Sequence, residues 1–488
     1  MKKKNGIRTA SLLLAALICI GTLISCGDGE DTPADTGENA ATAAQTEPET
    51  GYGALEKRKY NREFTILTRS DENAVSEFMV EKRTGAVLDD AVFERNVVVS
   101  EDYGITLNVL VNGDYSVVNS TLTTQVSTGL DEYDLYVGHK SSFSSCLQNN
   151  QLYDLGAIDT LDLLNPWWDK GCRENMTVYG HTFMINGDVN TNSLRTSSCF
   201  VFNKKLFTET GRAYPYEAVD NGKWTLDHMI ALTEGFTADK DGDGKISYKT
   251  DEYAMTAWMM ATPYSLFYGA GGRFVTMDED GTPVLNYDSE RVTDLYDKIY
   301  KLLITNQAYY VTDPSLYDSV YEVFTTGRAL FCDTSLVKIG VYLIEMGEDY
   351  GILPDPKFDE SQKEYYSFVN GATTLDMVAR SESNPEFVGA VLEAMGAYNY
   401  AHVTPTLYEA VTKLKNARDP ESARMVDVII RNRVFDFGYY ADLSLTNVVK
   451  DQIGKKSATI ASALKTADKN SRGALDKIVK KMAQYDGE

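Results

Sequence analysis

The chain has 488 residues, with 71 acidic against 47 basic side chains, and a formal net charge of −24. A surface this acidic repels phosphate backbones and anionic headgroups, so nucleic acid is excluded as a partner. The length exceeds what one hydrophobic core usually serves, which predicts two or more lobes.

Residues 1–25 have the pattern of a secretion signal peptide. Lysines and an arginine near the start precede an apolar run from Leu12 to Ile24, which is shorter than the ~20 apolar residues that a membrane-spanning helix needs. The following Cys26 ends a stretch, LISC, that resembles the lipobox of bacterial lipoproteins. This resemblance implies that Cys26 is lipidated with palmitate and that the protein is extracytoplasmic, anchored by lipid to the cell membrane. A plain signal peptide and an uncleaved anchor are the alternatives.

Residues 26–58 form the next segment, which begins GDGEDTPADTGENAATAAQ after the cysteine and has almost no large apolar side chains. Such a composition cannot bury enough surface to fold. The sequence therefore predicts a disordered tether between the anchor and the folded part.

Four further cysteines lie far apart in the chain and lack CxxC spacing, which argues against a zinc site: Cys146, Cys172, Cys199 and Cys332. Only Cys172 and Cys199 lie near one another, and a disulfide between them is a candidate. Dispersed cysteines need not pair even in an exported protein.

From residue 63 the chain alternates between strand and helix patterns. Strand-like EFTILTR, ITLNVLVN and YDLYVG are separated by helix-like AVFERNVVVSEDYG and DYSVVNSTLTTQVSTG, and the first helix is expected to end at Gly104. This βαβαβ order predicts an α/β fold with a mostly parallel, doubly wound sheet, whose ligand crevice lies beyond the carboxyl ends of the strands. No GxGxxG or GxxxxGK[ST] motif follows the strands, so a nucleotide site is not supported.

Several stretches in order along the chain resemble the extracellular solute-binding proteins of ABC importers, in particular the sugar-binding type that includes the maltodextrin-binding proteins. They are Asp134 in YDLYVG, FNKKLF at 202–207, Trp224-Thr225, FYGAGGRF at 267–274, FTTGRALF at 324–331 and DYGILPDPK at 349–357. The resemblance implies a two-lobe periplasmic-binding-protein-like fold (type II) that closes over a ligand, with ABC permease subunits as partners. We expect a monomer.

The resemblance also places three interlobe crossovers, near 185–189, 367–371 and 401–406. It implies one lobe from 59–187 and 368–403 and a second lobe from 188–367 and 404–488. Gly187 and Gly371 offer flexible backbone where a hinge would lie.

A carbohydrate ligand is expected, held by aromatic rings and polar groups on loops that match the family's cleft-lining segments. The aromatic candidates are Trp258, Tyr264, Tyr268, Tyr439 and Tyr440, and the polar candidates are Arg69, Asp71, His139, Lys140, Ser141, Asp188 and Asp333. The alternative for each aromatic residue is a packing role in the core, and for each polar residue a solvated loop position. The neighbouring tryptophans at 167 and 168 lie outside those segments and are interpreted as structural.

Residues 239–250, DKDGDGKISYKT, resemble a calcium-binding loop. Asp239, Asp241 and Asp243 hold the first, third and fifth positions, and Lys245 would offer its backbone carbonyl, but the twelfth position is threonine rather than glutamate. Asp251 or the glutamate after it could complete the coordination. A single loop cannot make a paired sensor, so we expect a structural Ca²⁺ here; a solvated acidic turn is the alternative. No other cofactor is expected.

Two other functions remain as alternatives. One is a surface lipoprotein that binds a peptide or another solute. The second is an extracytoplasmic glycan-degrading enzyme, because paired carboxylates in a carbohydrate cleft also serve glycosidases. The chain has four histidines and neither GxSxG nor HExxH, so we expect a binding protein and no enzyme, with no catalytic residues.

Overall fold

The computed structural model describes residues 51–412, 420–483 and 485, and these fall within one compact unit, Glu49–Glu488. The predicted signal peptide, Cys26 and most of the predicted tether lie outside the described residues. None of the described helices combines the length and apolar character needed to cross a bilayer.

The predicted tether ends earlier than residue 58. Gly51–Ala54 form a short 3-10 helix, and Tyr52 packs edge-on against Tyr398 with ring centroids 5.3 Å apart. The Tyr52 hydroxyl also donates to Asp102 over 2.9 Å, and Lys57 forms an ion pair with the same carboxylate over 3.1 Å. The segment is attached to the folded part because Tyr52 and Leu55 pack against an apolar cluster and the Tyr52 hydroxyl and Lys57 bind Asp102.

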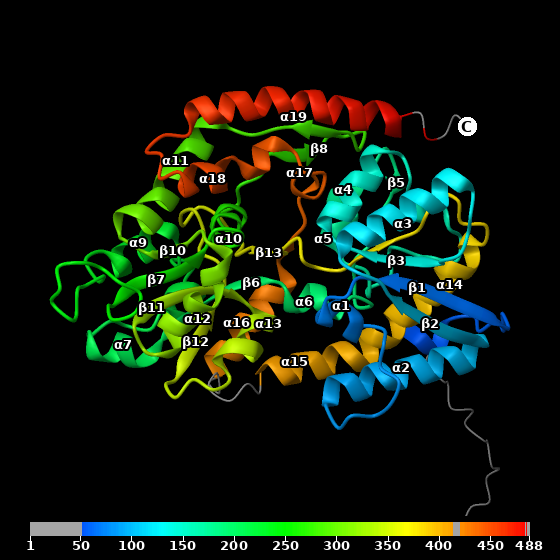
Figure 1. Cartoon of the computed structure of the whole chain (residues 1–488), viewed down its shortest axis with the longest axis horizontal. Coiled ribbons are helices and arrows are strands. Elements are labelled where there is room, and N and C mark those ends of the chain that lie inside the picture. Colours follow the sequence, from blue (N-terminus) through cyan, green and yellow to red (C-terminus); the bar gives the residue numbers. More distant parts are fainter. Residues whose placement is uncertain (1–50, 413–419, 484, 486–488) are drawn as a thin grey trace, which may run out of the picture. The chain divides into compact units, whose positions relative to one another are not determined.

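The first sheet has four strands in the order β14-β3-β1-β2 (Figure 1). The strands β1 (Arg62–Thr68), β2 (Ile105–Val111) and β3 (Leu135–Gly138) are parallel, and β14 (Leu375–Met377) joins antiparallel to β3. The predicted βαβαβ order is confirmed, and Gly104 ends the first long helix in the left-handed conformation, with φ of 60°. The helices of this half are α1 (Glu72–Ser76), α2 (Val87–Tyr103), α3 (Tyr115–Thr128), α4 (Lys140–Gln148), η2 (Leu155–Ala157), α5 (Lys170–Met176), α6 (Thr191–Arg195) and α14 (Pro385–Tyr398).

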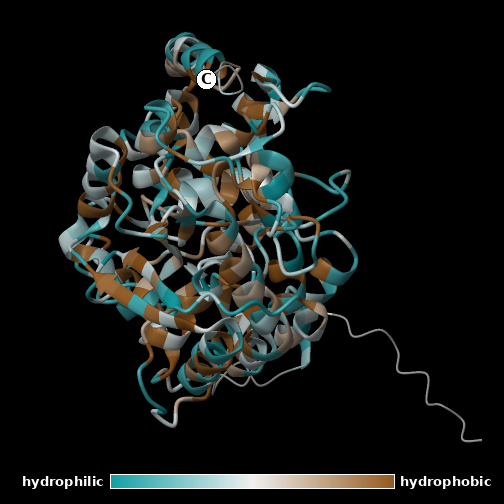
Figure 2. Cartoon of the chain, turned by 90° about the vertical axis from the view of Figure 1, so that its right-hand side faces the viewer, coloured by the Kyte–Doolittle hydropathy of each residue, from teal (hydrophilic) through white to brown (hydrophobic). Residues whose placement is uncertain are grey.

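Both faces of this sheet are covered, as expected for parallel strands. Phe64 and Ile66 of β1 pack into one apolar cluster together with residues of α2 and α14, while Leu67 belongs to the cluster on the opposite face. The strands therefore carry hydrophobic side chains on both sides. Figure 2 shows how hydrophobic (brown) and hydrophilic (teal) stretches alternate along the ribbon.

The second sheet has five strands in the order β10-β7-β11-β6-β12. The strands β7 (Tyr253–Trp258), β10 (Tyr309–Val311) and β11 (Ala329–Ser335) are parallel, whereas β6 (Ser198–Asn203) runs antiparallel to both β11 and β12 (Tyr350–Leu353). The helices around it are α7 (Lys204–Glu209), α8 (Tyr216–Asp220), α9 (Leu226–Thr233), α10 (Thr262–Gly269), α11 (Ser289–Tyr300), η3 (Lys301–Thr305), η4 (Pro314–Leu316), α12 (Tyr317–Thr325), α13 (Leu336–Lys338) and η5 (Ile339–Leu343).

The chain leaves the first sheet after β3 and enters the second at β6, and it returns from β12 to β14. Between the sheets, Ile185 bridges Asp376 and Ser197 bridges Val369, and β13 (Ser367–Phe368) pairs with β15 (Arg433–Val434). Two of the predicted crossover ranges, 185–189 and 367–371, lie in these connections. The total of three crossovers, and the lobe boundaries, stay predictions.

The two glycines expected at the hinge are required for close packing rather than for a special backbone angle. Neither has a positive φ. A Cβ on Gly187 would lie 2.3 Å from the carbonyl oxygen of Trp167, and one on Gly371 would lie 2.8 Å from the hydroxyl of Tyr439. Any side chain at either position would displace its neighbour.

The C-terminal part consists of helices that contact both halves. These are η6 (Asn399–Val403), α15 (Thr404–Thr412), α16 (Pro420–Arg431), α17 (Phe437–Tyr440), α18 (Ser444–Gly454) and α19 (Ala461–Met482). The long helix α19, red in Figure 1, packs on α18 and on the hairpin of β8 (Val275–Met277) and β9 (Pro283–Leu285), and its far end reaches α4. There Lys481 donates to the backbone carbonyl of Gln148. A second small hairpin, β4 (Thr177–Val178) with β5 (His181–Thr182), lies in the first half.

Candidate functional site

A cavity of about 470 Å³ lies between the two halves, where strands of both sheets end. Its walls come from the turn after β1, the start of α4, the ends of β7 and β11, the start of α10, and α17. Eight of the twelve predicted binding residues line it: Asp71, His139, Lys140, Ser141, Trp258, Tyr264, Asp333 and Tyr439. The carboxyl ends of parallel strands from both sheets thus border one cavity. This agrees with the strand-end rule, by which a ligand crevice lies beyond the carboxyl ends of parallel strands.

The first half contributes short turns capped by side chains. Asp71 caps α1, because its Oδ1 accepts from the backbone N–H groups of Asn73 and Ala74 over 3.1 Å each. His139 caps α4, since its Nδ1 accepts from the N–H of Ser141 over 3.1 Å, and its ring stacks on Tyr115. Burial, together with nearby Arg69 and Lys140, lowers the pKa of His139 to about 4. The imidazole is therefore neutral at physiological pH, and its proton is on Nε2, where it can donate to a ligand.

Aromatic rings form much of the wall from the second half. Trp258 is half-buried and meets Tyr317 edge-on at 5.2 Å, while Tyr264 stacks on Phe368 at 5.7 Å. The Tyr264 hydroxyl donates to Asn447 over 2.6 Å, which fixes the ring. A flat, partly exposed ring such as that of Trp258 offers an apolar face to the C–H groups of a ligand, while its surroundings offer hydrogen bonds.

Asp333 lies at the base of this wall and is only 3% exposed. Its Oδ2 accepts from the Thr262 hydroxyl over 2.8 Å, whereas Oδ1 has no hydrogen-bond partner among the described residues. Burial raises the pKa of Asp333 to about 7. Asp355, also fully buried, accepts from the hydroxyl of Ser198, another residue of the wall, and burial raises its pKa well above the usual range.

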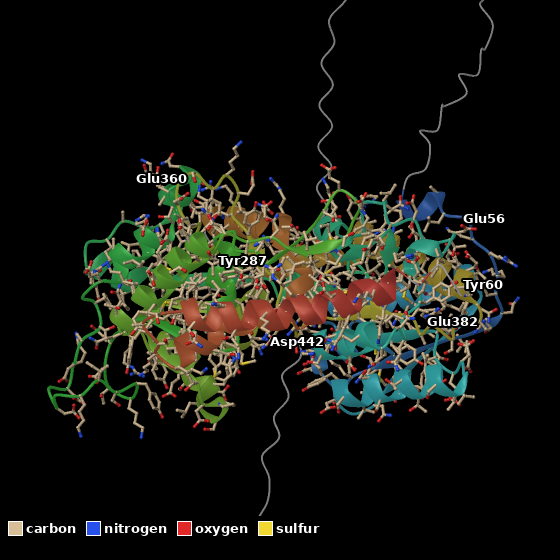
Figure 3. All side chains as sticks on the ribbon, turned by 90° about the horizontal axis from the view of Figure 1, so that it is seen from above. Glu56, Tyr60, Tyr287, Glu360, Glu382 and Asp442 are labelled. Atoms are coloured by element: carbon tan, nitrogen blue, oxygen red, sulfur yellow. The ribbon has the colours of Figure 1, made fainter. Side chains whose placement is uncertain are left out.

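An ion pair crosses the cavity. Lys140 of α4 donates to Asp442, which follows α17, over 2.6 Å, and the same ammonium lies 4.5 Å from the centre of the Tyr439 ring. Asp442 is labelled in Figure 3. Because Asp442 is half exposed, the pair contributes little to stability, but it joins the first half to the C-terminal segment directly at the cavity.

Four predicted binding residues do not reach the cavity. Arg69 is buried and donates to the carbonyls of Gly138 and Ala372, so it holds the strand ends together. Asp188 accepts from Thr404, away from the cavity. Tyr268 and Tyr440 are core residues whose hydroxyls donate to Asp436 and to the carbonyl of Val369. Arg69, Tyr268 and Tyr440 lie on segments that border the cavity but are buried, and Asp188 lies outside those segments.

The structure adds residues that the sequence analysis missed. Among them are Tyr317 and Tyr321 on α12, Lys338 on α13, and Asp442 and Asn447 near the C-terminus. Lys338 lies on α13, which directly follows β11, and it was not among the residues selected through the family resemblance. The tyrosines are four residues apart, which places them on one face of a helix, but nothing local distinguishes that face from a core face.

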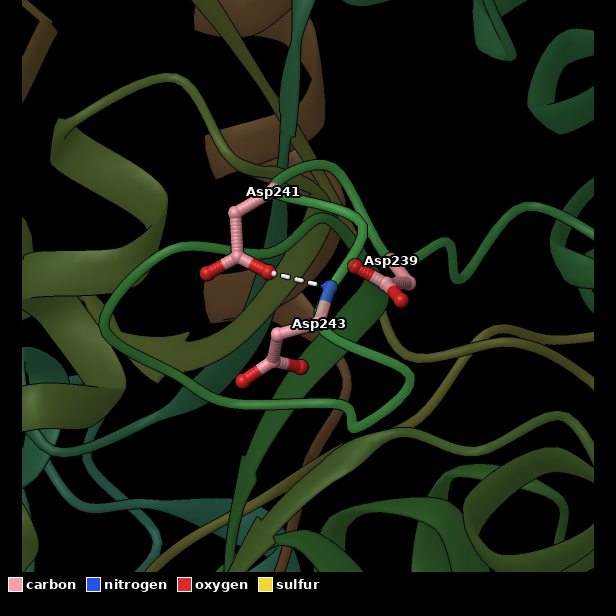
Figure 4. Close-up of side chains that lie close together, drawn as sticks. All are labelled: Asp239, Asp241 and Asp243. Atoms are coloured by element: carbon pink, nitrogen blue, oxygen red, sulfur yellow. Dashed lines mark hydrogen bonds between the residues drawn. The ribbon is translucent and has the colours of Figure 1, made fainter.

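The predicted calcium loop brings its aspartates together, as Figure 4 shows. One carboxylate oxygen each from Asp239, Asp241 and Asp243 lie within 4.8 Å of one another. The loop turns at Gly242 and Gly244, whose φ angles of 76° and 80° favour glycine. The predicted ligand Asp251 is not part of this group of three close carboxylates. Its two oxygens accept from the N–H groups of Lys240 and Ser247 over 2.8 and 2.7 Å. Three close carboxylates fit a hard cation such as Ca²⁺, although fewer than its usual ligand number.

The candidate disulfide is wrong. Cys172 and Cys199 are both free and fully buried, Cys172 on α5 and Cys199 on β6, in different apolar clusters. Burial raises the pKa of both thiols well above the usual range. The two cysteines lie in different halves of the structure although they are near one another in sequence, because the chain passes from one half to the other between them.

Comparisons with known proteins agree with this architecture. A family model described as "Bacterial extracellular solute-binding protein" matches residues 98–384. A search of curated protein sequences finds no match.

Solved structures with this fold are numerous, and three of them illustrate the likeness. A cyclo/maltodextrin-binding protein complexed with maltotetraose has a TM-score of 0.54 at 14% identity, covering 87% of this chain and 97% of that chain. The galacto-N-biose-/lacto-N-biose I-binding protein of the ABC transporter from Bifidobacterium longum has a TM-score of 0.57 at 13% identity, covering 85% and 97%. The cyclic alpha-maltosyl-1,6-maltose binding protein from Arthrobacter globiformis has a TM-score of 0.56 at 14% identity, covering 85% and 98%. The predicted two-lobe α/β fold is confirmed.

Proposed function

Because the chain belongs to the family of bacterial extracellular solute-binding proteins, we propose that it captures a carbohydrate, a sugar or oligosaccharide, between its two lobes. It delivers this ligand to the permease subunits of an ABC importer without altering it chemically. The solved structures of the same fold described above include proteins bound to maltotetraose and to lacto-N-biose, which supports a saccharide as the ligand class.

The observation that carries the proposal is the composition of the cavity between the lobes. It joins the half-exposed ring of Trp258, for stacking on a sugar, to polar groups from both lobes. The neutral imidazole of His139 donates through Nε2, while Asp333 keeps an unpaired oxygen to accept from a ligand hydroxyl. A sugar has apolar ring faces and hydroxyls around its rim, and this cavity offers a partner to each.

Capture requires the lobes to close on the ligand. A ligand shifts an open protein toward a closed one only through its preference for the closed form, and contacts from both lobes provide this preference. The ion pair of Lys140 and Asp442, made from opposite sides of the cavity, is one contact that forms or breaks as the lobes move.

The proposal also includes the place of the protein in the cell and an ion bound away from the cavity. The family is extracellular, and we place this member on the outer face of the cell membrane, held by a lipid on Cys26 and by a tether that ends before residue 51. A tethered monomer of this kind reaches the permease by diffusion within the length of its tether. The loop with Asp239, Asp241 and Asp243 binds a structural Ca²⁺ that stabilises the second lobe without touching the cavity.

Thermal-shift measurements against a carbohydrate panel, with peptides and polyols as controls, test this function. A ligand at a hundredfold excess over its dissociation constant adds about 2.7 kcal/mol to stability, which is readily detected. Solution scattering should show a smaller radius of gyration with the same ligand. Binding of a peptide in place of any saccharide would contradict the assignment of a sugar as the ligand. Turnover of a glycan by the pure protein would contradict the proposal that the ligand is not altered chemically.

A further inference from the structure

We propose that the captured saccharide is acidic and that its anionic group, a carboxylate or a sulfate ester, binds Lys338. This inference rests on the proposed function and narrows its ligand class.

Lys338 is a residue of intermediate exposure at the cavity wall. It lines the cavity from α13, and its Nζ lies 5.8 Å from the ring centre of Tyr317 and 5.7 Å from that of Tyr342. Within the part of the chain that the structure describes, no carboxylate lies within ion-pair distance of it and no acceptor takes its hydrogen bonds. Partial burial of an ammonium is costly unless a negative partner compensates for the lost water.

The carboxylates of the cavity are engaged elsewhere. Asp442 pairs with Lys140 over 2.6 Å. Asp71, on the opposite lobe, receives two backbone N–H groups as the cap of α1. Asp333 accepts from Thr262, and since burial raises its pKa to about 7, it is partly protonated near neutral pH. In a chain with a net charge of −24, a cation at a binding cavity that has no carboxylate partner among the described residues is a specific feature, and an anionic ligand would supply that partner.

The position of Lys338 fits a group attached to a sugar ring. Tyr317 contacts Trp258 edge-on at 5.2 Å, and its ring centre lies 5.8 Å from the Nζ of Lys338. Trp258 and Lys338 thus share Tyr317 as a neighbour in the cavity lining, so a saccharide stacked on Trp258 extends toward Lys338. Asp333, with its unpaired oxygen on the same wall, accepts from a neighbouring hydroxyl of the same ring.

The test measures affinity for matched pairs of saccharides by calorimetry with the purified protein. The pairs are D-glucuronate with D-glucose, D-galacturonate with D-galactose, and D-glucose 6-sulfate with D-glucose, together with the corresponding disaccharides. The acidic member should bind roughly tenfold to a hundredfold more tightly, the range for a hydrogen bond to a charged group. Lys338→Gln should bring the affinities for the acidic and the neutral member close to each other, while Lys338→Arg should retain the preference for the acidic member.

Lys477→Gln is the matched control, because Lys477 is exposed on α19, far from the cavity lining. It removes the same charge and should keep the preference. A native protein that binds neutral members as tightly as acidic ones, or a Lys338→Gln variant that keeps the preference, would overturn the inference and leave sugar capture standing. Failure of every saccharide to bind would overturn both.

Discussion

Replacing the buried carboxyl of Asp333 by the amide of asparagine should change how stability depends on pH. Burial raises the pKa of Asp333 from 3.8 to about 7 in the folded protein. A raised pKa means that the folded state holds the proton more tightly than the unfolded state. The contribution of the protonated group to stability is complete below pH 4 and is lost as the pH rises through 7. Over about three pH units this amounts to roughly 4 kcal/mol.

Asparagine has a similar shape, can still accept from Thr262, and carries no charge at any pH. The free energy of unfolding of Asp333→Asn minus that of the native protein should therefore increase by roughly 4 kcal/mol between pH 4 and pH 8. Denaturant unfolding of both proteins at pH 4, 6 and 8 measures this difference. Other buried carboxyls with raised pKa values, such as Glu77 and Asp376, titrate in both proteins and largely cancel.

Asp294→Asn, at an exposed position on α11, controls for the loss of one negative charge. The reasoning fails if the difference between Asp333→Asn and the native protein is the same at pH 4 and pH 8. That result would mean that Asp333 is ionised in the folded protein, with water or an ion at its unpaired oxygen.

Three other predictions concern the anchor, the ion and the ligand. Cys26→Ser should abolish labelling by radioactive palmitate, and unchanged labelling would exclude lipidation at this residue. Asp241→Ala combined with Asp243→Ala should lower the melting temperature and remove its sensitivity to EDTA, with little effect on ligand affinity, because the loop is not part of the cavity lining; melting of the native protein that is indifferent to EDTA would count against the ion. Trp258→Ala should weaken ligand binding by roughly 1 to 3 kcal/mol, as for other well-packed contact residues, whereas loss of stability at unchanged affinity would assign the ring to the core.

Sequence patterns were most informative where the cause is local. The βαβαβ order of the first lobe, the end of α2 at Gly104, and the turns of the acidic loop all depend on neighbouring residues, and the structure has them as predicted. The strand-end rule covers Asp71 and His139, since the carboxyl ends of parallel strands meet at one edge, whereas Asp333, on the second sheet, was selected through the family resemblance; all three line the cavity.

Local sequence patterns did not predict in which direction individual side chains point. Arg69 and Tyr440 lie on segments that border the cavity, yet Arg69 turns inward to satisfy backbone carbonyls and Tyr440 to donate to one. A buried polar group must find its partners wherever the fold places them, and the carbonyls of Gly138 and Val369 lie 69 and 71 residues away in the chain from Arg69 and Tyr440. The same limit applied to Cys172 and Cys199, which are close in sequence and separate in space.

By itself the sequence determined the class of fold, the order of its elements, the resemblance to sugar-binding proteins of ABC importers, and the acidic loop, because each of these depends on composition, periodicity or motif spacing. Tertiary structure alone decided which side chains share the cavity. It brought Lys338, Tyr317 and Asp442 to one cavity. Among the described residues it gave Lys140 a carboxylate partner and gave Lys338 none. Charge compensation depends on distances in space, and the folded chain sets those distances only when both lobes are assembled.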